Sequence, residues 1–241
     1  VADAAVNCVG TFDARGKNNF EAVQHEGAAR IARIAAEQGV SQLVHISAIG
    51  ADENGSSRYA RSKGKGEAAI LDAFPHAVIL RPSVVFGPED QFFNRFAAMA
   101  RTSPVIPLGG AGTKFQPVYV DDVAQAAEMG VLGTAAPGVY ELGGPDVNTF
   151  RELVEEMLQT IRRRRLILSL PFWVGWLMGT VTGAVSFLTG GLAPQPITVD
   201  QVKSLRQDNV VADGAKRLDD LGITSTAIRA VGPAYLWQIR P

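Results

Sequence analysis

The first third of the chain alternates short apolar segments with longer amphipathic ones, and this order constrains the fold more than any other feature. The pattern predicts buried strands at residues 4–10, 42–47 and 77–82, and helices at residues 18–38 and 58–73. The third strand stops at a proline, which has no N–H to continue a ladder. Strands alternating with helices of this length are typical of a parallel sheet with right-handed helical crossovers. We therefore predict an α/β fold.

The second half of the chain is less regular. A helix is predicted over residues 92–100, followed by a Pro/Gly-rich loop, a short strand over 138–144 and a further helix over 149–163. No internal repeat or low-complexity tract interrupts these segments. We expect a larger region at residues 1–145 and a smaller, mostly helical region at residues 146–241.

Composition narrows the class of partner. With 46% hydrophobic and 20% charged residues, the 241-residue chain has the composition of a soluble globular protein. Its formal net charge of −1 gives no basic footprint, so we expect no nucleic acid partner. Cys8 is the only cysteine, which excludes an internal disulfide and suits a reducing compartment. The histidines His25, His45 and His76 are scattered without a second ligand at metal spacing, so we expect no metal site.

Tyr59 and Lys63 form a Tyr-x-x-x-Lys pair on the helix predicted over residues 58–73. Positions four apart share a helix face, so the Lys63 ammonium can lie beside the Tyr59 phenol. We expect this charge to lower the pKa of Tyr59 toward the range useful for proton transfer. Ser47, at the end of the preceding strand, can donate its hydroxyl to a carbonyl oxygen. The alternative is a solvated tyrosine and lysine that share a helix by chance.

A long uncharged segment runs from Leu166 to Val199, directly after four arginines at residues 162–165. Its length would allow a membrane span, but Pro171 and Pro194 leave room for only a modest helix. One interpretation is a core helix of the second region beside a solvated basic turn. The other is a helix lying on a bilayer surface, where the arginines would suit anionic headgroups. Both interpretations remain open at this point.

Five segments of the chain match a known pattern in its known order: Asn7–Gly10, His45–Ala48, Tyr59 with Lys63, Leu80–Pro88 and Val118–Ala124. Together they resemble the extended or atypical branch of the short-chain dehydrogenase/reductase superfamily. The resemblance implies a Rossmann-like, doubly wound parallel sheet. It also implies that Ser47, Tyr59 and Lys63 are the catalytic residues, in working or vestigial form. The residues that would bind the nicotinamide cofactor are Asn7, Val9, Gly10, Ser47, Tyr59, Lys63, Arg81, Pro82, Ser83, Val84 and Val85.

One part of the superfamily pattern is missing. The Gly-x-x-Gly-x-x-Gly turn that binds the pyrophosphate should follow a strand and open a helix. The glycines at residues 109, 110 and 112 have neither neighbour. We therefore expect the first three strands of the sheet, together with this turn, to lie upstream of residue 1.

A closer likeness runs through residues 56–67, 72–75 and 86–92, and continues at 107–109 and 116–120. These segments resemble the Rossmann-type accessory subunits of respiratory complex I. The likeness implies a tightly held nucleotide, with NADP(H) favoured over NAD(H), in a structural or regulatory role with little or no turnover. It implies other subunits of a membrane respiratory complex as partners, with an anionic lipid surface as a further contact. The implied location is peripheral, on the cytoplasmic face of a bacterial inner membrane or the matrix face of a mitochondrial one.

The intact Tyr59–Lys63 pair also supports a second hypothesis, an active NAD(P)-dependent oxidoreductase or epimerase. In that case Tyr59 would be the general acid/base, Lys63 its electrostatic partner and ribose contact, and Ser47 the carbonyl donor. The substrate is not readable from this chain, and neither hypothesis is excluded by its sequence.

Overall fold

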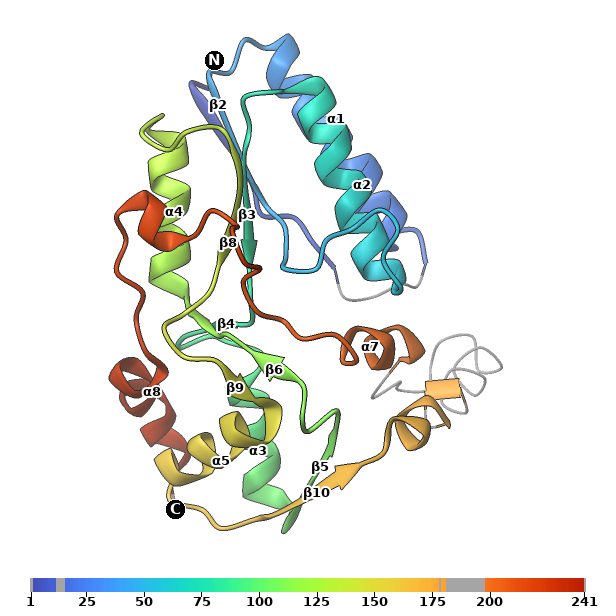
Figure 1. Ribbon diagram of the computed structural model, residues 1–241, viewed down its shortest axis with the longest axis vertical. Helices are drawn as coiled ribbons and strands as arrows, with labels where there is room; N and C mark the ends of the chain where they lie inside the picture. The colour runs from blue at the N-terminus through green and yellow to red at the C-terminus, as the bar shows by residue number, and fades with distance from the viewer. Residues whose placement is uncertain (1, 12–15, 178, 181–197, 241) are drawn as a thin grey trace. The chain divides into compact units, whose positions relative to one another are not determined.

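The computed structural model describes residues 2–11, 16–177, 179–180 and 198–240 (Figure 1). They fall into two compact units that interleave along the chain. The first unit comprises Val1–Val85, Gln116–Asp146 and Val210–Ala227, and the second comprises Phe86–Phe115, Val147–Asn209 and Ile228–Pro241. The chain passes from one unit to the other several times. The boundary expected between residues 145 and 146 lies next to only one of these passages, the one after Asp146. Residues 86–115 and 210–227 each belong to the opposite unit from the one expected, because long-range packing gathers them there.

The first unit is built on a four-stranded parallel sheet. Its strands are β1 (Ala4–Asn7), β2 (Gln42–Ile46), β3 (Val78–Pro82) and β8 (Gly138–Leu142). They pair in the order β1-β2-β3-β8, and all three pairings are parallel. The central strands are almost fully buried, as expected where both faces of a parallel sheet are covered. The prediction of a parallel α/β fold is confirmed.

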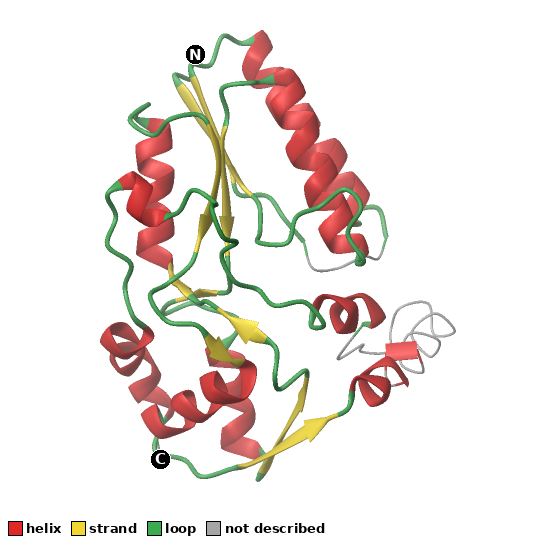
Figure 2. Cartoon of the chain, viewed as in Figure 1, coloured by secondary structure: helices red, strands yellow, loops and turns green. Residues whose placement is uncertain are grey.

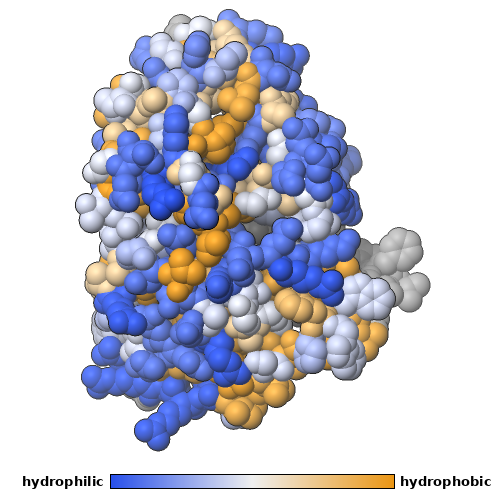
Figure 3. Space-filling view, in the orientation of Figure 1, coloured by the Kyte–Doolittle hydropathy of each residue, from blue (hydrophilic) through white to orange (hydrophobic). Residues whose placement is uncertain are grey.

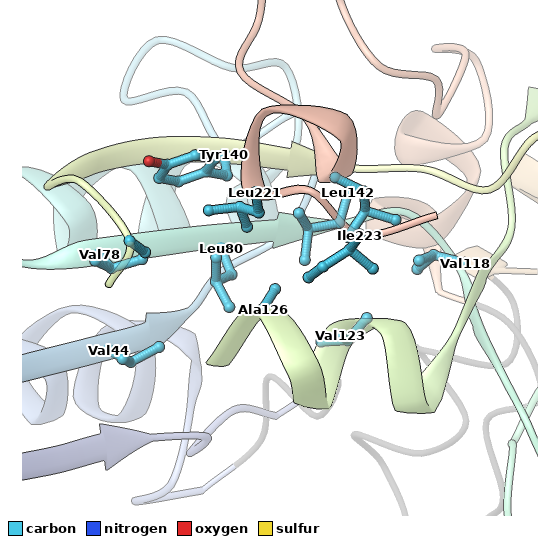
Figure 4. Packing of buried hydrophobic residues seen from close by; sticks show 12 residues of the cluster. Val44, Val78, Leu80, Val118, Val123, Ala126, Tyr140, Leu142, Leu221 and Ile223 are labelled. Atoms are coloured by element: carbon cyan, nitrogen blue, oxygen red, sulfur yellow. The ribbon is translucent and has the colours of Figure 1, made fainter. Parts of the chain in front are cut away.

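Helices cover both faces of this sheet (Figures 1 and 2). The π-helix η1 (Glu21–Glu26), α1 (Gly27–Glu37) and α2 (Arg58–Ala73) lie on one face. On the other face α4 (Val120–Val131) packs across β1, β2 and β3. A cluster of buried apolar side chains joins α4 to the strands, with Val44, Leu80 and Leu142 pointing toward Ala126 and Val123 (Figure 4). The doubly wound arrangement is therefore present.

The segment 210–227 returns from the second half of the chain to complete the first unit. Glu141 N donates to Lys216 O at 2.8 Å, so the segment runs alongside β8. Further on, the 3-10 helix η2 (Leu218–Leu221) adds Leu218 and Leu221 to the apolar cluster with α4. Such a return pairs residues more than seventy positions apart and has no local sequence signal.

The second unit contains the remaining elements. Its helices are α3 (Phe93–Thr102), α5 (Phe150–Thr160), α7 (Val199–Ser204), α8 (Ile228–Leu236) and the 3-10 helix η3 (Trp237–Ile239). Parallel β5 (Val105–Gly109) and β10 (Leu166–Leu170) form one pair, and antiparallel β6 (Lys114–Phe115) and β9 (Asn148–Thr149) form another. Two further short strands do not belong to the second unit alone: β4 (Val85–Phe86) spans the boundary between the units, and β7 (Val118–Tyr119) belongs to the first unit. Thr149 and Glu152 cap α5 reciprocally in a capping box.

The uncharged segment 166–199 is not one continuous helix. It begins with strand β10, and residues 172–177 are helical. Residue 178 and residues 181–197, including Pro194, lie outside the described residues. Among the helices that the structure describes, none combines the length and apolarity that a bilayer crossing requires.

Candidate functional site

A strip of polar residues, formed by Asn7, His45, Arg81 and Glu141, crosses the sheet face that α2 covers. Successive strand residues point to opposite faces, and one alternate set forms the apolar cluster with α4. The other set faces α2 and is polar near the carboxyl ends of the strands, where Asn7 lies beside His45 and Arg81 beside Glu141 in register. The carboxyl edge of such a sheet is where ligands of doubly wound proteins bind.

Helix α2 supplies the matching polar groups. The Ser57 hydroxyl caps its first turn by accepting a hydrogen bond from Ala60 N at 3.0 Å. Lys63 and Glu67, four residues apart on one helix face, are both buried against the strip. Lys63 Nζ donates to Ile46 O at 3.1 Å. A Cβ added to Gly10 would lie 3.7 Å from this ammonium, so Lys63 also lies beneath the turn after β1.

Glu67 is the centre of a buried charge network. Its carboxylate accepts hydrogen bonds from Arg81 at two points, Nε to Oε1 at 3.0 Å and Nη2 to Oε2 at 2.6 Å. Arg81 Nη1 reaches Glu141 Oε1 at 3.3 Å, and Glu141 Oε2 accepts from Ala212 N at 2.9 Å. Bidentate contacts between arginine and carboxylate are strong and directional. Arg81 was predicted to line a cofactor pocket, and in the structure its guanidinium binds these two carboxylates.

Ser47 also points to this network. Its hydroxyl donates to Glu67 Oε1, and the side chain is buried. The structure thus places Ser47 and Lys63 against neighbouring turns of α2, Ser47 through Glu67 and Lys63 through Ile46 O. Their catalytic roles remain predictions. Glu67, the acceptor for Ser47, was not among the predicted site residues.

Tyr59 behaves differently from the expectation. Its ring meets the edge of Phe20 in a T-shaped contact, with centroids 5.9 Å apart. Burial raises the pKa of Tyr59 to about 12, where a lowered pKa was expected. The expectation considered the charge of Lys63 and overlooked the loss of solvation, which opposes phenolate formation. Burial also lowers the pKa of Lys63 to about 8, against the opposing charge of Glu67. The predicted activation of the phenol is therefore wrong for this structure.

His45 is a structural member of the strip. Asn7 Nδ2 lies 3.0 Å from His45 Nδ1, and Asn7 Oδ1 accepts from Val9 N at 3.1 Å. The amide nitrogen can only donate, which leaves the ring proton of neutral His45 on Nε2. Nε2 is buried without a hydrogen-bond partner among the described residues. Burial, helped by the charge of Lys63, lowers the pKa of His45 to about 3, so the ring is neutral at physiological pH.

The residues present fit the nicotinamide end of a dinucleotide. Val9 and Gly10 are exposed in the turn after β1, and the Lys63 ammonium lies directly beneath this turn. Lys63 uses one N–H for Ile46 O, and its other N–H groups can donate to ribose hydroxyls. Of the other predicted residues, Pro82 ends β3 and Ser83, Val84 and Val85 follow it; all four are buried or half-buried at the same edge.

Gln24 of η1 is a further residue that the sequence did not indicate. Its Nε2 donates to Thr11 O at 2.6 Å, and its Oε1 accepts from Ser62 Oγ at 2.7 Å. Gln24 therefore ties the chain that follows the Asn7–Gly10 turn to helix α2. Gln24 follows Phe20 by four positions, on the apolar face of the predicted helix, and a polar residue at such a position is a signal that could have been recognised.

Comparisons with known proteins agree with this fold. The model of the NAD dependent epimerase/dehydratase family matches residues 2–143. Two solved structures share the fold at 14% sequence identity. MoeE5 in complex with UDP-glucose and NAD has a TM-score of 0.70, covering 98% of this chain and 78% of that chain. The dTDP-4-dehydrorhamnose reductase of Bacillus anthracis in complex with NADP has a TM-score of 0.61, covering 84% of this chain and 79% of that chain.

Curated relatives are more similar in sequence. Subunit 9 of the NADH dehydrogenase [ubiquinone] 1 alpha subcomplex, mitochondrial, from Arabidopsis thaliana is 34% identical over 247 residues, covering 99% of this chain and 61% of the relative. The ceramide reductase of Caulobacter vibrioides is 29% identical over 172 residues, covering 70% of this chain and 54% of that protein. The chain thus spans less than two thirds of the length of these relatives.

Proposed function

Because the chain belongs to the NAD dependent epimerase/dehydratase family, we propose that it holds NADP(H) as an accessory subunit of a membrane-bound NADH:quinone oxidoreductase, with little or no turnover. The relative from Arabidopsis thaliana, a named subunit of NADH dehydrogenase, supports the assignment to a respiratory complex. In this proposal the first unit binds the nucleotide, and the second unit supplies the interface with other subunits.

The main support for the absence of turnover is the hydrogen bond from Ser47 to Glu67. The only proton of the Ser47 hydroxyl is directed to Glu67, which Arg81 holds in place. Burial also keeps the proton on the Tyr59 phenol, since it raises its pKa to about 12. Ser47 is therefore not set to polarise a carbonyl, and the raised pKa makes the Tyr59 phenol a weaker acid. Lys63, in contrast, is placed to bind the ribose, and this function needs no turnover.

The bound nucleotide would supply hydride chemistry if a carbonyl reached it. The side chains at the carboxyl edge of the sheet would bind and orient its nicotinamide end through the Asn7–Gly10 turn and the Lys63 ammonium. We favour NADP(H) because of the likeness to complex I accessory subunits. Both NAD and NADP occur in the structures that share this fold.

The test is to purify the whole protein gently from its natural membrane. We expect NADP(H), identified by mass spectrometry after release, and other subunits of an NADH:quinone oxidoreductase in the same fraction. Substituting Lys63→Ala should lower the retained nucleotide about tenfold or more, since it removes a charge-assisted contact to the ribose. A free protein that carries no nucleotide and ignores the membrane would contradict the proposal.

The second unit exposes apolar side chains that suit a membrane surface. Leu166 and Leu168 of β10 and Trp173, Trp176 and Leu177 beyond it are all about half exposed or more. Figure 3 shows apolar side chains at the lower right of this face, in the region of β10.

The four arginines at residues 162–165 differ in their exposure and in their contacts. Arg162 and Arg164 are exposed, whereas Arg163 and Arg165 donate to the carbonyls of Ile239 and Ala100. We propose that the exposed group contacts an anionic lipid surface.

Substituting Trp173→Ser together with Trp176→Ser should weaken binding to vesicles of anionic lipid about tenfold or more, because two large aromatic side chains leave the interface. The measurement is flotation of the protein with vesicles that contain phosphatidylserine. Trp237→Ser, at another exposed tryptophan of the same unit, serves as the matched control and should leave flotation unchanged. Equal flotation of all variants would mean that this surface contacts protein instead.

The alternative function is an active NAD(P)-dependent oxidoreductase, and the similarity to a ceramide reductase favours it. The two functions predict different results for Tyr59→Phe, which removes only the phenol oxygen. If Tyr59 is the general acid, the variant should lose about a hundredfold or more of any hydride transfer. If the protein only holds its nucleotide, respiratory NADH oxidation and the retained nucleotide should both stay at the wild-type level.

A further inference from the structure

Ser47 has one hydroxyl proton, and it is donated in a hydrogen bond to a carboxylate. The hydroxyl donates to Glu67 Oε1, and both side chains are buried. A serine that activates a carbonyl must direct the same proton to the substrate oxygen. The two uses of this proton exclude each other, so the position of Glu67 decides what Ser47 can do.

The surrounding charges hold Glu67 in this position. Its two oxygens are bound by Arg81 at 3.0 and 2.6 Å. Arg81 is anchored in turn by Glu141 at 3.3 Å, and Glu141 accepts from the backbone of Ala212. A rotation that released Ser47 would break the two-point contact and leave the guanidinium partly unpaired. An ionised acceptor also binds a hydroxyl proton more strongly than a neutral carbonyl does.

We propose that Glu67 is a positioning residue that withholds Ser47 from carbonyl chemistry, so that reduced nucleotide at this edge of the sheet is retained without being oxidised. This inference rests on the proposed function and assigns the loss of the Ser47 hydrogen-bond donor to one carboxylate. In the suppressed reaction, a carbonyl carbon would accept hydride from the reduced nicotinamide, and the carbonyl oxygen would take a proton from Tyr59. The products would be an alcohol and the oxidised nucleotide.

The first experiment needs no nucleotide. Chemical unfolding is measured for the whole protein with Ser47→Ala, Glu67→Gln and both substitutions. We expect the two effects to be non-additive, with an unfolding equilibrium constant for the double variant about tenfold below the product of the single effects. Ser47→Ala combined with Thr149→Ala, whose hydroxyl caps α5 in the second unit, is the control pair and should be additive.

The second experiment measures whether carbonyl reduction begins when Ser47 is released from Glu67. Glu67→Leu removes the acceptor, and the protein loaded with NADPH is mixed with a panel of small aldehydes and ketones. We expect the nicotinamide absorbance to fall about tenfold faster or more than in the wild type, because a carbonyl gains a donor. Adding Ser47→Ala to this variant should remove the gain. Glu37→Leu, which removes an exposed carboxylate at the end of α1, is the control and should give no gain. If Glu67→Leu does not fold, Glu67→Gln is measured in the same way and should give a smaller gain, because its amide is a weaker acceptor.

Additive unfolding effects of Ser47 and Glu67, or no gain from the Glu67 variant that folds, would overturn this proposal. The proposed function fails differently, through a wild-type protein that reduces carbonyls steadily or that is purified without nucleotide. The unfolding experiment on protein without nucleotide separates the two failures, because it does not depend on what the site binds.

Discussion

Replacing Gly66 by alanine should lower the free energy of unfolding by about 3 kcal/mol, at the upper end of the range for overpacking a core. A Cβ at this position would lie 2.1 Å from the carbonyl oxygen of Gln24. The obstructing atom is backbone of η1, so no side-chain rotation can relieve the clash. Helix α2 and η1 would have to move apart. The measurement is denaturant unfolding of the whole protein.

The substitution should also weaken nucleotide retention, because Gln24 ties Thr11 and Ser62 together. Gly232→Ala in α8 is the matched control. A Cβ there would meet side chains only at 3.5 Å and beyond, which is ordinary contact. We expect this control to leave stability unchanged or raise it by up to about 1 kcal/mol through helix propensity. Similar destabilisation by both substitutions would mean that the close approach of α2 to η1 is not what Gly66 provides.

Much of the first unit could be predicted because its signals are local. The strands are short apolar segments, and α2 occupies the predicted residues 58–73, with Ser57 as its cap. The spacing of Tyr59 and Lys63 placed both on this helix. The interleaving of the units could not be predicted, because it depends on contacts such as Glu141 N to Lys216 O between distant segments. No periodicity within either segment encodes such a pairing.

The sequence predicted which elements carry the candidate site residues, but it did not predict their electrostatics. Lys63 donates to Ile46 O, next to Ser47 in the chain, yet the partner of the Ser47 hydroxyl is Glu67. A signal for Glu67 existed, since it follows Lys63 by one helical turn and Arg81 is a lone cation in an apolar strand. Tyr59 shows the other difficulty. The effect of a neighbouring charge can be inferred from spacing, but the degree of burial cannot, and here burial determines the direction of the pKa shift.

Lowering the pH from 6.5 to about 4 should reduce the free energy of unfolding by about 3 kcal/mol through His45 alone. Burial, helped by the charge of Lys63, lowers the pKa of His45 to about 3 in the folded protein. Below its ordinary pKa of 6.5 the unfolded chain binds a proton that the folded protein does not. The unfolded state therefore gains protons relative to the folded state, and stability falls with pH until about pH 3. Other acidic groups contribute in the same range, so the wild type must be compared with a variant.

The comparison is the pH dependence of unfolding for the wild type and for His45→Gln, in protein without nucleotide. The difference in unfolding free energy between the two proteins should decline by roughly 1.4 kcal/mol per pH unit between pH 6 and 4. This slope corresponds to the uptake of one proton. His76→Gln, at an exposed position, is the control and should keep the wild-type slope. Parallel curves for His45→Gln and the wild type would mean that His45 gains its proton as easily when folded as when unfolded. Water would then reach Nε2, and the strip that holds Lys63 and Glu67 would be solvated. An ordinary, solvated network would not hold Ser47 firmly enough to keep it from a substrate.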